Sequence, residues 1–242
     1  MNKIYDYSPN FSLPKRQKKR IKFIIIHYTG MKKEIDSIKR LQNPRSKVSS
    51  HYLIKKNGKI LILVPDLYEA WHAGLSKWKN HENLNKNSIG IEITNPGHQY
   101  GYKNFSRLQI FSLEKLLISL IKKFRIKKKY ILGHSDISPD RKKDPGEKFP
   151  WAKLAKNGLT WYHNLDLKKI KKFRKVKLSS KIEENIFLKN LYKIGYKKIE
   201  GLKMSKNIEY LTKAFQRRFR QDLVDGKIDR ECLIISKNLV SN

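Results

Sequence analysis

Cysteine is nearly absent from this chain of 242 residues, which contains only Cys232. An internal disulfide and a metal site built from several cysteines are therefore both excluded. Long apolar runs are missing too. None approaches the roughly 18 residues of a membrane-spanning helix, so we expect no membrane span. The first residues also lack the apolar segment of a secretory signal peptide before the basic stretch at 15–22.

Acidic residues are scarce as well. The chain has 21 Asp and Glu against 55 Lys and Arg, which gives a net charge of +34. Such a charge attracts polyanions, and nucleic acid, anionic lipid headgroups and anionic wall polymers all qualify. A second interpretation is compositional, because most of the excess is lysine in a chain rich in Ile and Asn. Charge alone does not choose between these partners or between these interpretations.

The apolar pattern predicts several strands. Residues 21–27 form a continuous apolar run, which is typical of a buried central strand. Residues 51–54 and 60–64 flank an Asn57-Gly58 pair, which favours a hairpin. In residues 88–93, polar or small residues alternate with isoleucines, so one face of this strand is apolar and the other is not.

Helices are expected between these strands. Residues 34–41 suit a short helix, and 106–124 have helical apolar spacing with Ser106 as a plausible N-cap. Residues 130–133 form the last strand, followed by a loop that extends from His134 to Pro150. Because strands and helices interleave, about the first 155 residues predict an α/β domain with a mixed central sheet flanked by helices.

Composition divides the chain into four segments. Residues 1–20 are polar and suit an extended arm, 21–156 hold the α/β pattern, and 157–177 are strongly basic and suit a linker. Residues 178–242 predict a small helical domain. Its three amphipathic segments lie near 180–194, 207–220 and 229–240, with Gly195 and Gly226 in the turns.

Two histidines follow apolar strands, and this placement suggests a metal site. His27 ends one strand and His134 follows another, where open α/β sheets build their sites. Asp144 lies ten residues later, in a loop that Pro139 and Pro145 stiffen. Two imidazoles and one carboxylate leave a fourth position open, which is typical of catalytic zinc. The alternative for each histidine is a hydrogen-bonded core or rim position.

Five segments carry a resemblance to a known family. They are IIIHYTG (24–30), SSHYLI with its NG turn (49–58), AWHAG (70–74), NSIGIEITNPG (87–97) and GHSDISPDRKKDPGEKFPW (133–151). In this order, over about residues 20–155, they resemble the zinc-dependent N-acetylmuramoyl-L-alanine amidases of type 2. That family also includes phage amidase-lysozymes and animal peptidoglycan-recognition proteins.

The resemblance implies roles for five residues. His27, His134 and Asp144 fall on the family's zinc ligands, so it implies one Zn²⁺ per chain. Glu92 falls on the acidic residue that helps to activate water, and Lys142 on the lysine that polarises the scissile carbonyl. These roles are also reasonable chemically, because amide hydrolysis needs an activated water, a proton carrier and positive charge beside the oxyanion.

Other residues of these segments are candidates for binding the substrate. Trp71 and His72 fall in a segment with which the family lines its groove, although His72 also suits a structural role near the metal. His51 is a third candidate, with a position behind the metal shell as its alternative. Ser50 occupies a position that is tyrosine in some branches, which leaves Glu92 as the proton carrier. The remaining histidines have no motif context and are expected at the surface: His81, His98 and His163.

The last quarter of the chain resembles the peptidoglycan-binding helical domain of Gram-negative amidases. The similar stretches are LYKIGYKKIEG (191–201) and LTKAFQRRFRQDLVDGKID (211–229). The resemblance thus implies a catalytic amidase domain at 21–156 and a helical peptidoglycan-binding-like domain at 178–242. A basic helical bundle of another function is the alternative for the second domain.

The function implied is hydrolysis of the amide bond between N-acetylmuramic acid, or its anhydro form, and L-alanine in peptidoglycan or its fragments. Such a reaction serves wall turnover, remodelling or recycling. One alternative is a protein that binds peptidoglycan without cleaving it, although family members of that kind typically lack a metal ligand. The other is a nucleic-acid-binding protein, for which no motif is present. We expect a monomer in the cell envelope, with a leader absent from this chain. The alternative location is the cytoplasm, where recycling amidases act on released fragments.

Overall fold

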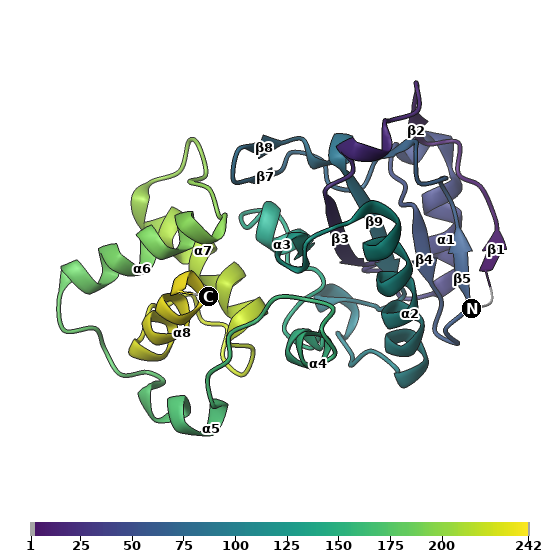
Figure 1. The fold of residues 1–242 in the computed structure, drawn as a ribbon. Coiled ribbons are helices and arrows are strands. Elements are labelled where there is room, and N and C mark those ends of the chain that lie inside the picture. The colour runs from purple at the N-terminus through teal and green to yellow at the C-terminus, as the bar shows by residue number, and fades with distance from the viewer. Residues whose placement is uncertain (1–2, 242) are drawn as a thin grey trace.

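The computed structural model describes residues 3–241. The molecule is elongated, with a sheet-containing part and a helical part, and the two termini lie at opposite ends (Figure 1). None of the helices in residues 3–241 has both the length and the apolar character needed to cross a membrane.

A six-stranded mixed sheet forms the centre of the first part, in the order β1-β5-β4-β9-β3-β10. Its strands are β1 (Lys3–Tyr5), β3 (Phe23–Tyr28), β4 (Tyr52–Ile54), β5 (Ile60–Ile62), β9 (Ser88–Ile93) and β10 (Ile131–Gly133). Strands β4, β9, β3 and β10 run parallel to one another, whereas β5 is antiparallel to β4. Two small antiparallel pairs complete the strands: β2 (Phe11–Ser12) with β6 (Glu69–Ala70), and β7 (Lys77–Trp78) with β8 (His81–Glu82).

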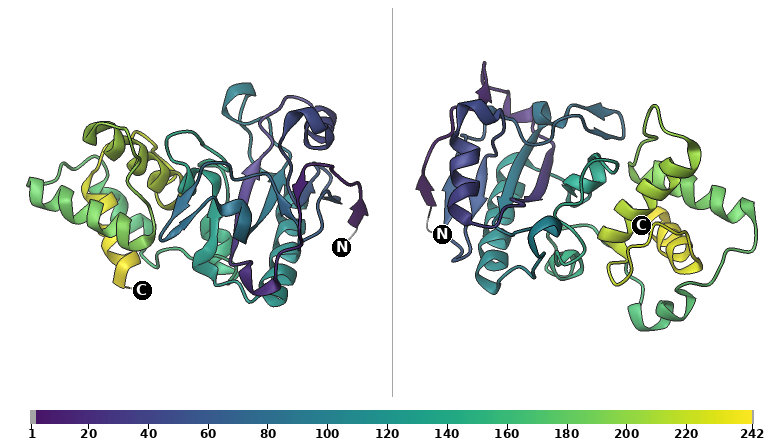
Figure 2. Two further views of the ribbon diagram at one scale, coloured as in Figure 1. Left: turned by 90° about the horizontal axis from the view of Figure 1, so that it is seen from above. Right: turned by 180° about the vertical axis from the view of Figure 1, so that it is seen from behind.

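Helices cover both faces of the sheet. The long helix α2 (Arg107–Phe124) packs on the isoleucine face of β3 and β9. On the opposite face lies α1 (Glu34–Gln42) (Figure 2). It packs on Leu53 of β4 and Leu61 of β5. Burying each of these aliphatic side chains stabilises the fold by about 1.5–3 kcal/mol. The predicted mixed α/β architecture is confirmed.

The local predictions for this part are mostly confirmed. The two strands around Asn57-Gly58 form an antiparallel hairpin. Ser106 caps α2, because its Oγ accepts from the Gln109 amide at 3.2 Å while Gln109 Oε1 accepts from the Ser106 amide at 3.0 Å. The stretch after His134 differs from the expected loop, since a one-turn helix, α3 (His134–Ile137), begins there. The Asp136 carboxylate stabilises this turn by accepting from the Gly133 amide at 2.8 Å.

The N-terminal segment, expected to be an extended arm, pairs with strands of the sheet-containing part. Strand β1 pairs with β5 at the sheet edge, and β2 pairs with β6. Arg16 is buried and donates to the backbone carbonyls of Asp66, Asn85 and Ser88. The polar composition of residues 1–20 did not reveal these contacts. Residues 1 and 2 lie outside the described residues.

The C-terminal part is a three-helix unit, as predicted. Its helices are α6 (Lys181–Ile194), α7 (Met204–Phe219) and α8 (Arg230–Ser241), and Gly195 and Gly226 in the turns have positive φ. Phe187, Phe215 and Tyr196 of this unit belong to the same apolar cluster as Phe23 and Leu132 of the sheet. The helical unit is therefore docked against the β3–β10 side of the sheet (Figure 1).

The connection between the two parts is also packed. It contains α4 (Trp151–Lys156) and α5 (Leu167–Ile170). Tyr162 and His163 each donate to the carbonyl of Phe219 in α7. His163, expected at the surface, is buried because of this contact.

Candidate metal centre and catalytic cleft

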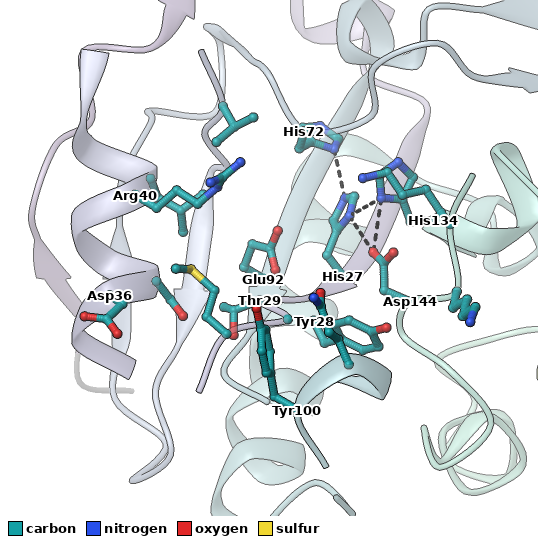
Figure 3. A pocket seen from close by; sticks show the side chains of 18 of the residues that line it. His27, Tyr28, Thr29, Asp36, Arg40, His72, Glu92, Tyr100, His134 and Asp144 are labelled. Atoms are coloured by element: carbon teal, nitrogen blue, oxygen red, sulfur yellow. Dashed lines mark hydrogen bonds and ion pairs between the residues drawn. The ribbon is translucent and has the colours of Figure 1, made fainter. Parts of the chain in front are cut away.

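A cleft of about 1040 Å³ opens on the α1 face of the sheet. Its lining comes from the end of β3, from α1 and from the loops at 48–49, 71–72, 98–100 and 141–144. Strands β9, β3 and β10 are parallel, so their carboxyl ends meet at one edge, where α/β sheets bind ligands. The cleft lies at this edge (Figure 3).

Three side chains converge on the floor of this cleft. His27 is the penultimate residue of β3, His134 begins α3 directly after β10, and Asp144 lies in the following loop. The Nδ1 atoms of the two histidines are 2.9 Å apart, and Asp144 Oδ2 lies 3.0 Å from His27 Nδ1 and 3.1 Å from His134 Nδ1 (Figure 3). All three residues are buried. The structure thus brings together the three residues that the sequence indicated as ligands.

The far side of the His134 ring determines its tautomer. His134 Nε2 lies 3.1 Å from the carbonyl oxygen of Ala73. A carbonyl can only accept, so Nε2 carries the proton and donates it. In a neutral ring the Nδ1 atom is then unprotonated and presents a lone pair to Asp144.

A chain of hydrogen bonds through His72 and Ser88 sets the tautomer of His27. The Ser88 hydroxyl donates to the Leu84 carbonyl at 2.5 Å, so its oxygen accepts from His72 Nε2 at 3.2 Å. His72 Nδ1 is then an acceptor and receives the proton of His27 Nε2 at 3.1 Å. His27 Nδ1 is left as a second lone pair on the cleft floor. Burial lowers the pKa of His27 to about 4, so the ring is neutral at pH 7.

The third member of the cluster is ionised. Burial by itself raises the pKa of Asp144, but the charges and hydrogen bonds of His134 and His27 outweigh it and hold this pKa well below its usual range. When both rings are neutral, their two Nδ1 lone pairs and this carboxylate oxygen face one another. A tetrahedral zinc with bonds of about 2.0–2.1 Å keeps its donor atoms roughly 3.3 Å apart, close to the separations seen here. The cluster fits a metal cation.

Glu92 lies beside this cluster. It pairs with His27 in the register of β9 and β3, on the same face of the sheet. Its Oε2 atom is buried, and no hydrogen-bond partner for it exists among residues 3–241. Burial and the charge of Asp144 raise the pKa of Glu92 to about 8, while the charge of Lys142 opposes the rise. Glu92 is therefore an unpaired carboxyl group poised to exchange a proton near neutral pH.

Lys142 lines the same cleft, two residues before Asp144. Its backbone amide donates to the Ser138 carbonyl at 3.0 Å, which fixes the start of the 141–144 loop. The side chain is half-buried, and its charge reaches both Glu92 and His27.

The expected substrate contacts separate into two groups. Trp71 and His72 line the cleft, whereas His51 does not. His51 is fully buried, accepts from the Gly90 amide at 2.9 Å and lies 3.0 Å from the Tyr68 carbonyl, so it holds β9 in place and cannot reach a ligand. Gly90 has a separate role, because a Cβ there lies 2.4 Å from the His72 ring and displaces it.

The sequence did not predict that His98 lines the cleft. His98, expected at the surface without a role, lines the cleft and accepts from the Tyr28 hydroxyl at 2.8 Å. Its other ring nitrogen donates to Glu147 at 3.0 Å. Its position in the sequence could have indicated this role, because residues 97–98 follow β9 at the sheet edge that carries the site. Ser50 is buried and donates to the Tyr52 carbonyl, away from the cleft.

Comparison with known proteins places this geometry in a family. Residues 17–147 match the family model described as N-acetylmuramoyl-L-alanine amidase. The N-acetylmuramoyl-L-alanine amidase AmiD of Escherichia coli is 33% identical over 234 residues, which are 91% of this chain and 83% of AmiD. The chain belongs to the N-acetylmuramoyl-L-alanine amidase family. The 1,6-anhydro-N-acetylmuramyl-L-alanine amidase AmpD of Haemophilus influenzae, another relative of this amidase, is 42% identical over 108 residues, 44% of this chain and 56% of AmpD.

Solved amidase structures extend the similarity to the helical unit. The AmiD complex with the substrate anhydro-N-acetylmuramic acid-L-Ala-D-gamma-Glu-L-Lys has a TM-score of 0.79, covering 92% of this chain and 89% of AmiD. AmpDh3 of Pseudomonas aeruginosa has a TM-score of 0.80 at 29% identity, covering 98% of this chain and 97% of AmpDh3. Both parts of the amidase described here thus occur together in these neighbours.

Proposed function

We propose that this amidase uses Zn²⁺ to hydrolyse the bond between the lactyl group of N-acetylmuramic acid, or its 1,6-anhydro form, and the L-alanine of the stem peptide. The observation that carries the proposal is the cluster of His27, His134 and Asp144 beside the unpaired carboxyl group of Glu92. Because the chain belongs to the amidase family, we assign amide hydrolysis to this cluster.

His27, His134 and Asp144 hold the ion in this proposal, and the Ala73 carbonyl and His72 orient the two rings. When bound there, zinc supplies Lewis-acid polarisation of the scissile carbonyl and of the attacking water. An ion held by only these three protein ligands would remain able to bind water or substrate, as hydrolysis requires.

Glu92 moves the proton. It accepts a proton from water as the water attacks the carbonyl carbon, and then gives it to the departing amide nitrogen of L-alanine. A carboxyl group with a raised pKa of about 8 serves both steps near neutral pH. Its position beside His27 keeps it close to the attacked bond without making it a ligand.

Lys142 stabilises the charge that develops on the carbonyl oxygen. Its ammonium group lines the cleft next to Asp144, and the half-buried setting strengthens its attraction to an oxyanion. An oxyanion donor of this kind contributes about 2.7–4 kcal/mol to catalysis.

The cleft suits a sugar-peptide substrate with carboxylates. Its lining combines aromatic rings with a cationic rim that includes Arg40, Lys32 and Lys143. AmiD was solved with an anhydro-muramyl tripeptide, and AmpDh3 with an anhydromuramic pentapeptide. We therefore place muropeptides with acidic stem peptides among the substrates of this amidase.

The chemistry belongs to residues 21–156 in this proposal, and residues 178–242 bind peptidoglycan, with 157–177 as the basic connection. The similarity of the helical unit to AmiD and AmpDh3 supports that division. A wall polymer as substrate favours the cell envelope as the location. We propose a monomer, because every residue assigned to the reaction comes from one chain.

Mass spectrometry of the products tests the reaction. A purified anhydro-muramyl tetrapeptide is incubated with the protein, and with a Glu92→Gln variant as the matched control. We expect a free peptide that begins with L-alanine and the intact anhydro-sugar acid, with far less of both from the variant. Binding of the muropeptide without cleavage by the wild-type protein contradicts the proposal and supports a binding protein instead.

A further inference from the structure

The last turn of α7 and the residues just after it contact both segments that carry the proposed metal ligands. Arg218 lies in α7 and Gln221 two residues beyond its end, and neither lines the cleft. The helical unit thus contacts the segments of the catalytic centre through hydrogen bonds as well as through the apolar cluster.

Arg218 contacts the segment that carries His134. Its guanidinium is almost fully buried, at 2% exposure. Nη1 donates to Asp136 Oδ2 at 2.6 Å, and Nη2 donates to the Ile131 carbonyl of β10 at 3.0 Å. The group also lies over the Trp151 ring, 4.4 Å from its centroid.

Asp136 connects Arg218 to the proposed ligand His134. It lies two residues after His134, and its Oδ2 also accepts from the Gly133 amide at 2.8 Å. Its other oxygen accepts from the Tyr196 hydroxyl, also of the helical unit, at 2.7 Å. The carboxylate therefore fixes the turn in which His134 leaves β10, and two side chains of the helical unit hold that carboxylate.

Gln221 contacts the segment that follows Asp144. Its Nε2 atom donates to the carbonyls of Glu147 and Phe149, each at 2.7 Å. These contacts hold the loop three to five residues beyond the ligand. Arg218 in α7 and Gln221 just after it thus restrain both segments of the metal cluster.

We propose that Arg218 and Gln221 are positioning residues of the metal centre, so that the helical unit sets the geometry of His134 and Asp144 in addition to any binding of the wall. The inference rests on the proposed function. Without Arg218, the buried Asp136 carboxylate loses its cationic partner, and a buried charge without a counter-charge draws water or moves toward it. Since Asp136 fixes the turn at His134, the ligand moves with it.

The test compares two buried arginines of the same helix end. Arg218→Met removes the contact to the metal centre. Arg220→Met is the control, because Arg220 is equally buried but its partners, Asp229 and Cys232, lie within the helical unit. Zinc dissociation constants are measured by chelator competition at a temperature where circular dichroism shows each variant folded.

We expect Arg218→Met to weaken zinc binding by about 10–100-fold, the range for residues that orient metal ligands, and Arg220→Met to leave the dissociation constant unchanged. Adding Asp136→Asn to Arg218→Met should recover part of the loss, because it removes the unpaired charge. If Arg218→Met does not fold, Gln221→Ala, a change at a half-buried position, must still weaken zinc binding several-fold.

Equal zinc affinities for the wild type and the folded variants overturn this inference alone. A wild-type protein that binds no zinc contradicts the proposed function and the inference with it. An equal loss of affinity in Arg218→Met and Arg220→Met also overturns the inference, because general loosening of the helical unit then explains both.

Discussion

The Nδ1 atoms of His27 and His134 face each other at 2.9 Å, with Asp144 Oδ2 about equally far from both. The outer nitrogen of each ring donates its proton elsewhere, so the inner nitrogen of a neutral ring has none to give. This arrangement is unfavourable unless a cation joins the three atoms. The hydrogen bonds of the cluster therefore support the proposed metal site, as its donor set does.

Asp144 provides the negative charge among the ligands. Asp144→Ala leaves two neutral imidazoles, and we expect it to reduce zinc binding sharply, because two ligands leave the ion under-coordinated. Elemental analysis of the purified protein measures this as zinc per chain. Asp140→Ala, an exposed position in the same loop, is the matched control and should keep its zinc. A variant at Asp144 with a full zinc content refutes the ligand assignment.

Glu92 and Lys142 are assigned to catalysis rather than to metal binding. We expect Glu92→Gln to lower kcat by about 10²–10⁴-fold, as for a lost general acid-base group, and Lys142→Met by about 10²–10³-fold, as for a lost oxyanion donor. Both variants should retain zinc, since neither residue belongs to the three-atom cluster. Steady-state kinetics on a soluble muropeptide decide the matter, and near-native turnover in either variant removes that residue from the mechanism.

His72 sets the tautomer of His27 through its link to Ser88. His72→Ala removes the acceptor of the His27 Nε2 proton, and we expect zinc affinity to fall by about 10–100-fold. Ser88→Ala removes only the far end of the path, so its effect should be smaller. Chelator competition ranks the variants, and a His72→Ala variant with wild-type affinity shows that the path does not matter for the ion.

Buried histidines outside the metal cluster make stability depend on pH. Burial lowers the pKa of His51 to about 3 and that of His163 to about 4, whereas both titrate near 6.5 in the unfolded chain. Between these values the unfolded state binds protons that the folded state does not. The free energy of unfolding is therefore highest above pH 6.5 and falls as the pH drops toward 4.

Urea unfolding of the metal-free protein from pH 7 to pH 5 measures this slope. Each such histidine contributes up to about 1.4 kcal/mol per pH unit, so His163→Gln should reduce the slope by up to that amount. A free energy of unfolding that is constant over this range, or that rises as the pH falls, contradicts the assignment.

Much of the fold could be predicted from the sequence, because local signals were strong. The alternation in 88–93 placed Glu92 on the polar face of its strand, and the Ser106 cap marked the start of α2. His27 and His134 could be paired because parallel strands end at the same edge of a sheet. In each case, neighbouring residues carried the information.

Contacts between distant segments could not be predicted in this way. Arg218 and Asp136 are 82 residues apart, and in a chain with 55 basic residues no charge pattern singles out one arginine. His98 and His163 were expected at the surface because their partners, Glu147 and the Phe219 carbonyl, lie on other segments. The short helix after His134 likewise depends on Asp136, whose own partners come from the helical unit.

Zinc titration of the stripped enzyme tests the central claim most directly. The protein is freed of metal with a chelator, zinc is returned in steps, and cleavage of a soluble muropeptide is measured at each step. We predict no cleavage without metal and a rise in rate that levels off at one zinc per chain. Undiminished cleavage by the metal-free protein, or none regained after one equivalent, contradicts the account.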